Sequence, residues 1–181
     1  MTVEQLIATL PEFAKDTRLN LSTLLSGVDR DDLSAKQLAG VALACAYATK
    51  HKKLITVMQH YGKDFLSAAD VEGIKIAVSI MAMNNIYYRF VHMTSDPVFK
   101  TLPAKLRMNK MAASGIDGLD FELYSLAVSA LEGCQLCVDT HVQALKKHGL
   151  TQVGIQTAIR LAAVINATAQ SLIVVEGDEI A

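Results

Sequence analysis

The stretch DFELYSLAVSALEGCQLCVDTHVQALKKHG, Asp120 to Gly149, contains two helical segments and two of the chain's three cysteines. Both segments have the apolar spacing of a helix, and Gly133 lies between them. Glycine is unfavourable in a helix interior, so we expect the helix to break there. Basic and imidazole side chains at residues 146–148 before Gly149 are typical of a helix C-terminus. The stretch therefore predicts two consecutive helices with the cysteines directly after the break.

The rest of the chain has the same helical character. Hydrophobic residues make up 51% of its 181 residues, with three prolines and no tryptophan. Such a composition favours helices and supplies enough apolar surface for a core. Strand alternation and hairpin turns are nearly absent. We expect an all-α fold in a single domain over residues 1–181.

Charge and cysteine usage exclude several classes of protein. The formal net charge is −1, which gives no electrostatic footprint for nucleic acid or for an anionic membrane. The N-terminus MTVEQLIATLPEF has no basic leader, and apolar runs such as VALACAYA are too short to span a bilayer. Three cysteines are too few for a secreted disulfide scaffold. We expect a cytoplasmic protein in which the close cysteine pair is catalytic or binds a metal.

Helix-capping and turn-forming residues mark the expected ends of the helices along the chain. Capping-box patterns predict helix starts at Thr2, Ser34 and Ser67. Two prolines and two glycines within residues 94–118 predict a connector, with a short helix around AKLRMN, residues 104–109. The connector separates two regions that both read as helical.

The two helical regions resemble each other. Shifting the chain by 81 positions pairs His60 with His141 without a gap and relates two halves, approximately residues 34–93 and residues 115–175. The match predicts an internal duplication of two helical halves. Cys134 and Cys137 align with residues that cannot do thiol chemistry, so we expect only the second half to carry the reactive site.

The cysteine pair and a histidine share one helical face. Cys134, Cys137 and His141 lie three and four residues apart, which aligns them along one stripe if the segment is helical. A break at Gly133 puts Cys134 near a helix N-terminus, where a thiol pKa falls from its ordinary value of about 8.5. His141 is the candidate general base for Cys137, and Cys134 could attack an adduct formed on Cys137.

A general base also needs an orienting group, and spacing does not select one. Glu122, Glu132 and Asp139 are the nearby carboxylates. Asp139 lies off the stripe, and Glu132 precedes the break. Glu122 could reach His141 if the chain folds back at Gly133. The three candidates stay open at this point.

Three other interpretations compete with a redox-active dithiol that acts on a substrate. The cysteines could be small hydrophobes in an apolar helix. Two thiolates and His141 could hold zinc, with Glu122 or Asp139 as the fourth ligand. A dithiol that senses oxidation without a substrate of its own is the third. Elsewhere, we expect Cys45 to be buried and inert, and the methionines at positions 81, 83, 93, 108 and 111 to fill the core and interfaces.

The segment FELYSLAVSALEGCQLCVDTH, residues 121–141, strongly resembles the active-site region of the alkyl hydroperoxidase D family, within the carboxymuconolactone decarboxylase-like superfamily. The segments LPEFAKDTRLNLSTLL, MAMNNIYYRF and LRMN are also similar to that family, so the resemblance covers essentially the whole chain. A glutamate twelve residues before the first cysteine and a histidine seven after it make the match specific.

The resemblance implies an all-helical, internally duplicated fold, a homo-oligomer that is typically a trimer, and a peroxidase activity without bound metal or haem. It makes Cys137 the peroxidatic thiol, which forms a sulfenic acid. Cys134 becomes the resolving cysteine and proton donor. His141 and Glu122 become the relay that deprotonates Cys137.

The resemblance also implies partners. The substrates are organic hydroperoxides, and the lipoyl group of a 2-oxoacid dehydrogenase acyltransferase reduces the disulfide again. Cys134 passes electrons through a mixed disulfide to the peroxiredoxin alkyl hydroperoxide reductase C. Some family members have a histidine where this chain has Leu136, so intrinsic peroxide turnover is expected to be slower. The alternative is a dithiol exchange adaptor or redox sensor of the same fold without peroxidase activity. A decarboxylase activity is less expected, because relatives with that chemistry do not depend on the dithiol.

Overall fold

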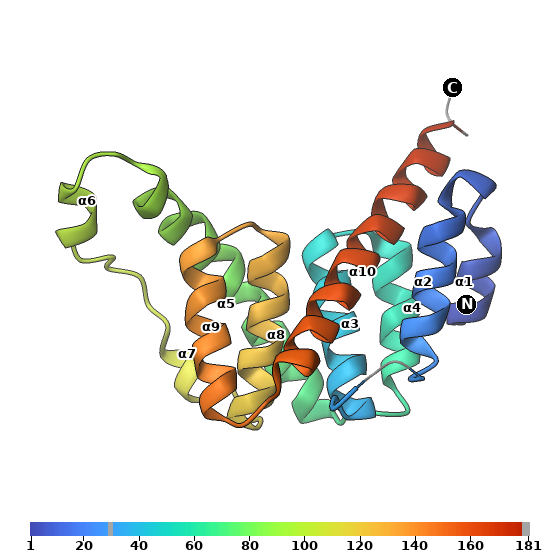
Figure 1. The fold of residues 1–181 in the computed structure, drawn as a ribbon, viewed down its shortest axis with the longest axis horizontal. Coiled ribbons are helices and arrows are strands. Elements are labelled where there is room, and N and C mark those ends of the chain that lie inside the picture. The colour runs from blue at the N-terminus through green and yellow to red at the C-terminus, as the bar shows by residue number, and fades with distance from the viewer. Residues whose placement is uncertain (29–30, 179–181) are drawn as a thin grey trace.

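The structure, a computed structural model, describes residues 1–28 and 31–178 and contains helices and no strand over that part of the chain (Figure 1). The expected all-α fold is therefore confirmed. The helices are α1 (Val3–Thr9), the 3-10 helix η1 (Glu12–Ala14), α2 (Lys15–Leu25), α3 (Ala35–Thr49), α4 (Lys52–Gly62), α5 (Ala68–Met93), α6 (Val98–Thr101), α7 (Asn109–Ala112), α8 (Gly118–Leu131), α9 (Gln135–Lys147) and α10 (Gln152–Asp178).

Capping boxes begin α1, α3 and α5, as the sequence predicts. The side chains of Thr2, Ser34 and Ser67 each accept a hydrogen bond from the backbone N–H three residues on, and the side chain of that residue returns a bond to the cap. Each box satisfies two backbone donors that the first helical turn leaves without a partner. Local sequence therefore sets where these helices begin.

Helices α3, α4 and α5 are similar in length to α8, α9 and α10, taken in chain order. The first three have 15, 11 and 26 residues, and the second three have 14, 13 and 27. An internal duplication would produce such an order, and the duplication stays a prediction.

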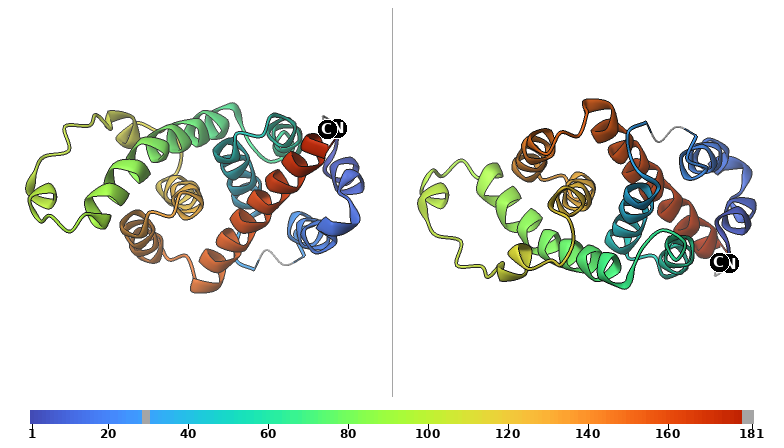
Figure 2. Two further views of the ribbon diagram at one scale, coloured as in Figure 1. Left: turned by 90° about the horizontal axis from the view of Figure 1, so that it is seen from above. Right: turned by 90° about the horizontal axis from the view of Figure 1, so that it is seen from below.

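Helix α8 lies at the centre of the bundle, in contact with α3, α5, α9 and α10 (Figure 2). Most of its residues are buried, and Tyr124 is among the largest fully buried side chains of the core. The Tyr124 ring lies so close to the backbone of Gly40 that a larger residue at position 40 would overlap it. Glycine on α3 therefore allows α3 and α8 to approach closely.

Helix α10 crosses the bundle and contacts α2, α3 and α8 (Figure 1). Within the described residues it is the one helix that is long and apolar enough to cross a membrane, by length and composition only. The sequence analysis did not anticipate this helix as a candidate span. Its buried side chains, among them Leu161, Ile165 and Leu172, belong to the bundle core.

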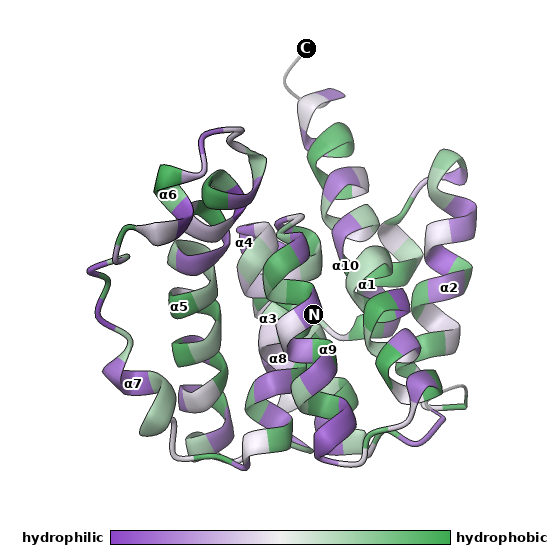
Figure 3. Ribbon diagram, turned by 60° about the vertical axis from the view of Figure 1, so that its left-hand side comes forward, coloured by the Kyte–Doolittle hydropathy of each residue, from purple (hydrophilic) through white to green (hydrophobic). Residues whose placement is uncertain are grey.

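The connector between α5 and α8 leaves the bundle and returns to it through α6 and α7 (Figures 1 and 3). The short helix predicted over residues 104–109 is wrong, because residues 103–108 have no regular structure. Pro103 lacks a backbone N–H, and Lys105 has a φ of 52°, in the left-handed region that interrupts a right-handed helix. Helix α7 begins only at Asn109.

A charge network joins the N-termini of α3, α5 and α8. Lys36 Nζ on α3 lies 2.8 Å from Asp70 Oδ1 and 2.9 Å from Asp120 Oδ2, and both carboxylates are buried. Burial is the largest single influence on Asp70 and would raise its pKa. Hydrogen bonds from Lys36 and Ser67 together outweigh it, so the pKa of Asp70 is lowered. The pKa of Lys36 is raised in turn, first because its ammonium donates a hydrogen bond to Asp70 and then because it donates one to Asp120.

We expect Lys36→Met to lower the free energy of unfolding by about 2 kcal/mol, because it leaves two buried carboxylates without their cation. Asp70, with its lowered pKa, contributes stability above the ordinary aspartate pKa of about 3.9, and that contribution is lost as the pH falls. Urea unfolding between pH 3 and 7 should show the two proteins converging in acid.

Lys75→Met is the matched control, since Lys75 forms a 3.6 Å ion pair with Glu72 at the exposed surface. It should change stability by less than about 0.5 kcal/mol. Equal losses in the two variants, or a Lys36→Met effect that is constant with pH, would contradict the assignment.

Candidate active site

A left-handed turn ends α8 and starts α9. Gly133 has a φ of 67°, its N–H bonds to the carbonyl of Ala130, and the N–H of Cys134 bonds to the carbonyl of Ser129. These two bonds form a Schellman motif, which favours glycine at the left-handed position. Cys134 follows as the N-cap of α9. The helix break predicted at Gly133 is confirmed, and it places Cys134 at a helix N-terminus.

Cys134 and Cys137 lie on one turn. Their sulfur atoms are at bonding distance, and their Cα atoms are 5.3 Å apart, so the pair takes the form of a disulfide. Cys134 Sγ also accepts the backbone N–H of Cys137 at 3.4 Å, as an N-cap side chain does. The backbone of this turn therefore holds the two sulfurs at the distance at which a disulfide forms.

Glu122 is the carboxylate that contacts His141. The Glu122 side chain on α8 lies 2.6 Å from His141 Nδ1 on α9, where Nδ1–H donates to Oε2. The chain folds back at Gly133 and sets the two helices side by side, which produces this contact. The backbone carbonyl of Glu132 instead accepts a hydrogen bond from Arg89 on α5. Asp139 forms no ion pair within the described part of the chain.

The other ring nitrogen of His141 faces a sulfur atom. Nε2 lies 3.3 Å from Met81 Sδ on α5, in a buried contact. Among the described residues, no hydrogen bond joins His141 to Cys137 while the Cys137 sulfur is bonded to Cys134. Since Nδ1 is engaged by Glu122, Nε2 is the nitrogen that remains for exchanging a proton in the pocket.

Cys137 and His141 line the same pocket, which has a volume of about 300 Å³. Cys137 is 7% exposed and His141 is 5% exposed, whereas Cys134 is fully buried and is not among the described residues that line this pocket. The two cysteines are therefore unequal: an incoming molecule meets Cys137 first, and Cys134 lies behind it.

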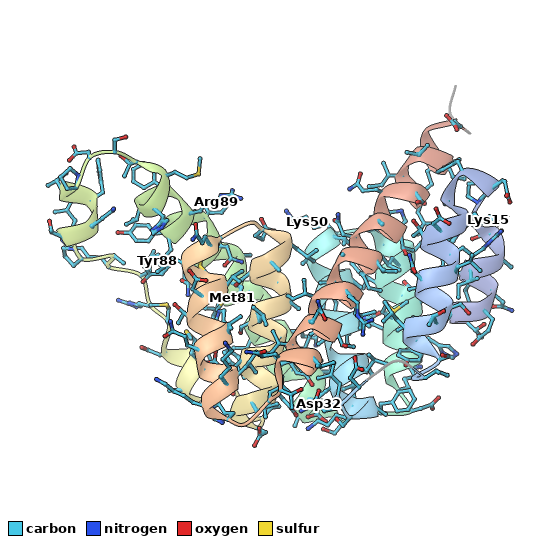
Figure 4. The ribbon with its side chains drawn as sticks, in the orientation of Figure 1. Lys15, Asp32, Lys50, Met81, Tyr88 and Arg89 are labelled. Atoms are coloured by element: carbon cyan, nitrogen blue, oxygen red, sulfur yellow. A yellow bond between two sulfur atoms is a disulfide. The ribbon has the colours of Figure 1, made fainter. Side chains whose placement is uncertain are left out.

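Apolar side chains form most of the pocket wall. The thioethers of Met81, Met108 and Met111 surround it, with Tyr88 and Leu136. Met81 and Tyr88 both project from α5, beside α9 (Figure 4). No lysine or arginine lines it within the described residues. Such a wall suits an uncharged substrate with an apolar substituent.

Sequence reasoning missed the part that the methionines play in this pocket. It treated them as core or interface filler, but Met108 and Met111 reach the site because the connector packs α7 against α5. The Asn84 side-chain amide donates to Met108 Sδ at 3.1 Å and so helps to hold that thioether. Residues 24 or more positions apart form these contacts, so no local pattern could have found them.

The remaining candidates stand apart from the site. Cys45 is fully buried, and burial raises the pKa of its thiol, which makes it inert as expected. His51 caps α4 by accepting the N–H of Leu54, and His60, the partner of His141 in the expected duplication, is exposed. Within the described residues, no group of three or more His, Cys, Asp or Glu side chains is placed to hold a metal ion.

Comparison with known proteins identifies the family to which this chain belongs. A family model described as the carboxymuconolactone decarboxylase family matches residues 97–175. A protein of Coxiella burnetii named alkyl hydroperoxide reductase AhpD is 52% identical over 165 residues, which cover 91% of this chain and 93% of the relative. Proteins of the same name from Bradyrhizobium sp. and Maricaulis maris are 45% and 46% identical, over 95% of this chain and 93% and 98% of theirs. The chain therefore belongs to the alkyl hydroperoxidase D family, within the carboxymuconolactone decarboxylase-like superfamily.

Proposed function

We propose that this protein is an antioxidant enzyme that reduces organic hydroperoxides with the Cys134–Cys137 dithiol. One observation carries the proposal: Cys137 faces an apolar pocket together with His141, which Glu122 holds through Nδ1, while Cys134 lies within bonding distance behind it. The relatives named alkyl hydroperoxide reductase support the same substrate class.

The proposed oxidation has two steps. The Cys137 thiolate attacks the terminal oxygen of the hydroperoxide, the O–O bond breaks, and the alkoxide takes a proton and leaves as the alcohol. Cys137 is then a sulfenic acid. The Cys134 thiol attacks that sulfur, water leaves, and the disulfide forms. His141 Nε2 accepts the Cys137 proton beforehand, and the Glu122 carboxylate stabilises the imidazolium through Nδ1.

The disulfide has to be reopened by thiol exchange in each cycle. We propose that a lipoyl group on a 2-oxoacid dehydrogenase acyltransferase supplies the two electrons, with no cofactor bound to this chain. We also propose that Cys134 can pass electrons to alkyl hydroperoxide reductase C through a mixed disulfide. Because Cys134 is fully buried, that exchange requires the turn at the start of α9 to open.

A second candidate function has an observation in its favour. Leu136 lines the pocket beside Cys137 and is 38% exposed, so no imidazole is available at that position. Slow intrinsic turnover with intact dithiol exchange would make the protein mainly an adaptor between the lipoyl donor and the peroxiredoxin. Both functions use the same two sulfurs, and the rate of peroxide consumption by the isolated protein separates them.

The pocket argues against decarboxylation of a carboxylate substrate. A decarboxylase has to bind a carboxylate, and no lysine or arginine lines this pocket among the described residues. A thioether wall also offers little to a charged substrate. The reaction that we propose for this chain is therefore not the decarboxylation after which the matching family is named.

We also propose a cytoplasmic homo-oligomer, expected to be a trimer. Exposed apolar side chains concentrate near the end of α5 and on the adjacent connector, namely Ile86, Phe90, Met93, Val98 and Leu102. Such an apolar tip is typical of a surface at which protein subunits associate. A cytoplasmic location agrees with a dithiol that has to be reduced again in every cycle.

We expect Cys137→Ser to reduce turnover of cumene hydroperoxide with dihydrolipoamide to the uncatalysed rate, because the nucleophile is lost. Before reductant is added, Cys134→Ser should release one equivalent of alcohol per subunit and then stop with Cys137 as a sulfenic acid, since the protein has no second thiol there to resolve it. Reductant consumption and alcohol release give both results. Cys45→Ala is the control and should retain wild-type turnover, and full turnover by Cys137→Ser would refute the proposal.

Glu122→Gln tests the relay. Loss of the negative charge next to Nδ1 leaves the imidazolium less stable, so less thiolate forms on Cys137. We expect kcat/KM for the hydroperoxide to fall about 10- to 100-fold. In a Cys134→Ser background, the alkylation rate of Cys137 should reach its midpoint at higher pH. Asp139→Asn is the matched control on α9. An unchanged alkylation profile in Glu122→Gln would remove Glu122 from the relay.

The apolar tip can be tested by solution mass. Val98→Asp combined with Leu102→Asp puts charges into the proposed interface, so light scattering should detect a shift from the oligomer to the monomer. Helix content by circular dichroism should stay unchanged. Leu19→Asp, at an exposed position on α2, serves as the comparison. A wild-type protein that is monomeric at micromolar concentration would contradict the assembly.

A further inference from the structure

The connector carries an excess of positive charge. Residues 97–116 contain four basic side chains and no acidic one, although the whole chain has a net charge of −1. The four are Lys100, Lys105, Arg107 and Lys110, and all are exposed. Within the part of the chain that the structure describes, none of them forms an ion pair. A local block of unpaired charge of one sign attracts molecules of the opposite sign.

This charge lies next to the redox pocket. Met108 lines that pocket and also lines a neighbouring groove of about 590 Å³ between α5 and the connector. Arg107 and Lys110 line the groove on either side of Met108. Lys75 lines it from α5, but Glu72 pairs with it, so the uncompensated charge comes from the connector.

The pocket limits what can reduce the disulfide. While the turn at the start of α9 is closed, Cys137 is only 7% exposed within a pocket of about 300 Å³, so the body of a folded protein cannot bring its own surface to the sulfur. A thiol at the end of a long flexible side chain can enter. A donor of that kind needs a second contact, outside the pocket, that holds its protein body while the arm reaches in.

We propose that Lys105, Arg107 and Lys110 form a docking surface for an acidic protein domain that carries its dithiol on a flexible arm. The inference rests on the proposed function, because it names the kind of partner that delivers electrons to the Cys134–Cys137 disulfide. A donor thiolate attacks one sulfur, a mixed disulfide forms, and the other sulfur leaves as a thiolate. The second donor thiol then closes the donor disulfide. Two electrons and two protons pass to this protein.

The groove favours a protein over a nucleic acid as the occupant. Ile76, Ile80 and Met83 supply apolar surface between the charged side chains. An apolar centre with a charged rim is the usual anatomy of a protein–protein interface, whereas nucleic-acid interfaces are far more uniformly charged. Charges at the rim of an interface act mainly on the association rate. Salt screens them, and the Debye length is about 10 Å at 0.1 M ionic strength.

The test compares two reductants with one set of variants. The docking variant is Lys105→Gln, Arg107→Gln and Lys110→Gln combined. The control variant is Lys52→Gln, Lys53→Gln and Lys63→Gln combined, which removes the same charge on and just after α4, a helix that packs against α1 and α3. The reductants are free dihydrolipoamide and the same group attached to an acidic lipoyl domain. Disulfide reduction is followed by stopped-flow at 20 and 300 mM salt.

We expect the docking variant to lose at least tenfold in the second-order rate with the domain-bound donor at low salt, and to react with free dihydrolipoamide at the wild-type rate. High salt should slow the wild type to near the variant. Equal rates for the docking and control variants with the domain-bound donor would overturn the docking surface. Failure of the wild type with both reductants would instead overturn the lipoyl-linked function.

Two further measurements test whether the variant changes the assembly and whether the surface binds another class of partner. Light scattering should give the docking variant the same assembly as the wild type, since the substituted residues lie outside the apolar tip defined above. Wild type and variant are also compared for binding to a single-stranded RNA and to anionic vesicles. Charge-dependent binding to either, together with an unchanged rate for the domain-bound donor, would overturn an acidic protein as the occupant.

Discussion

The left-handed turn at Gly133 is the constraint on which the reactive site depends. It ends α8 with two backbone hydrogen bonds and starts α9 at Cys134, so that one cysteine caps the helix and the other lies on its first turn. The same reversal sets α9 alongside α8 and brings Glu122 to His141, nineteen residues apart in the chain. A side chain with a Cβ at position 133 would strain this conformation. One backbone angle therefore couples the disulfide to its relay.

The scaffold around this turn consists of packed helices on one side and an irregular segment on the other. Helix α8 is fixed by the close approach of Tyr124 to Gly40 and by the Lys36 network at its N-terminus. Cys137, His141 and Glu122 therefore sit on packed helices, which suits groups that have to keep their geometry through a redox cycle. The outer wall comes from the connector, where residues 103–108 have no regular structure. The proposed substrate and donor would therefore approach along this irregular wall.

Local signals in the sequence predicted what local chemistry determines. The capping boxes, the break at Gly133 and the shared face of Cys137 and His141 all depend on residues within about two turns of each other. Glu122 could not be chosen over Glu132 and Asp139 from spacing, because only the angle between α8 and α9 decides which carboxylate contacts His141. The helix predicted at residues 104–109 failed because Lys105 adopts a left-handed φ, which composition does not reveal. The methionines in the pocket wall come from separate elements and needed the tertiary structure.

The contact between His141 and Met81 bears on how the proposed relay would work through the proposed cycle. In the disulfide form, the Cys137 sulfur is bonded to Cys134 and no longer competes for a proton. His141 Nε2 then lies against a thioether, which is only a weak acceptor and does not titrate. A carboxylate there would form a second strong ion pair and compete with the thiolate for the imidazolium. A thioether carries no charge and is only a weak acceptor, so it offers no such competition, and Nε2 stays available for exchanging a proton with Cys137 when the disulfide opens.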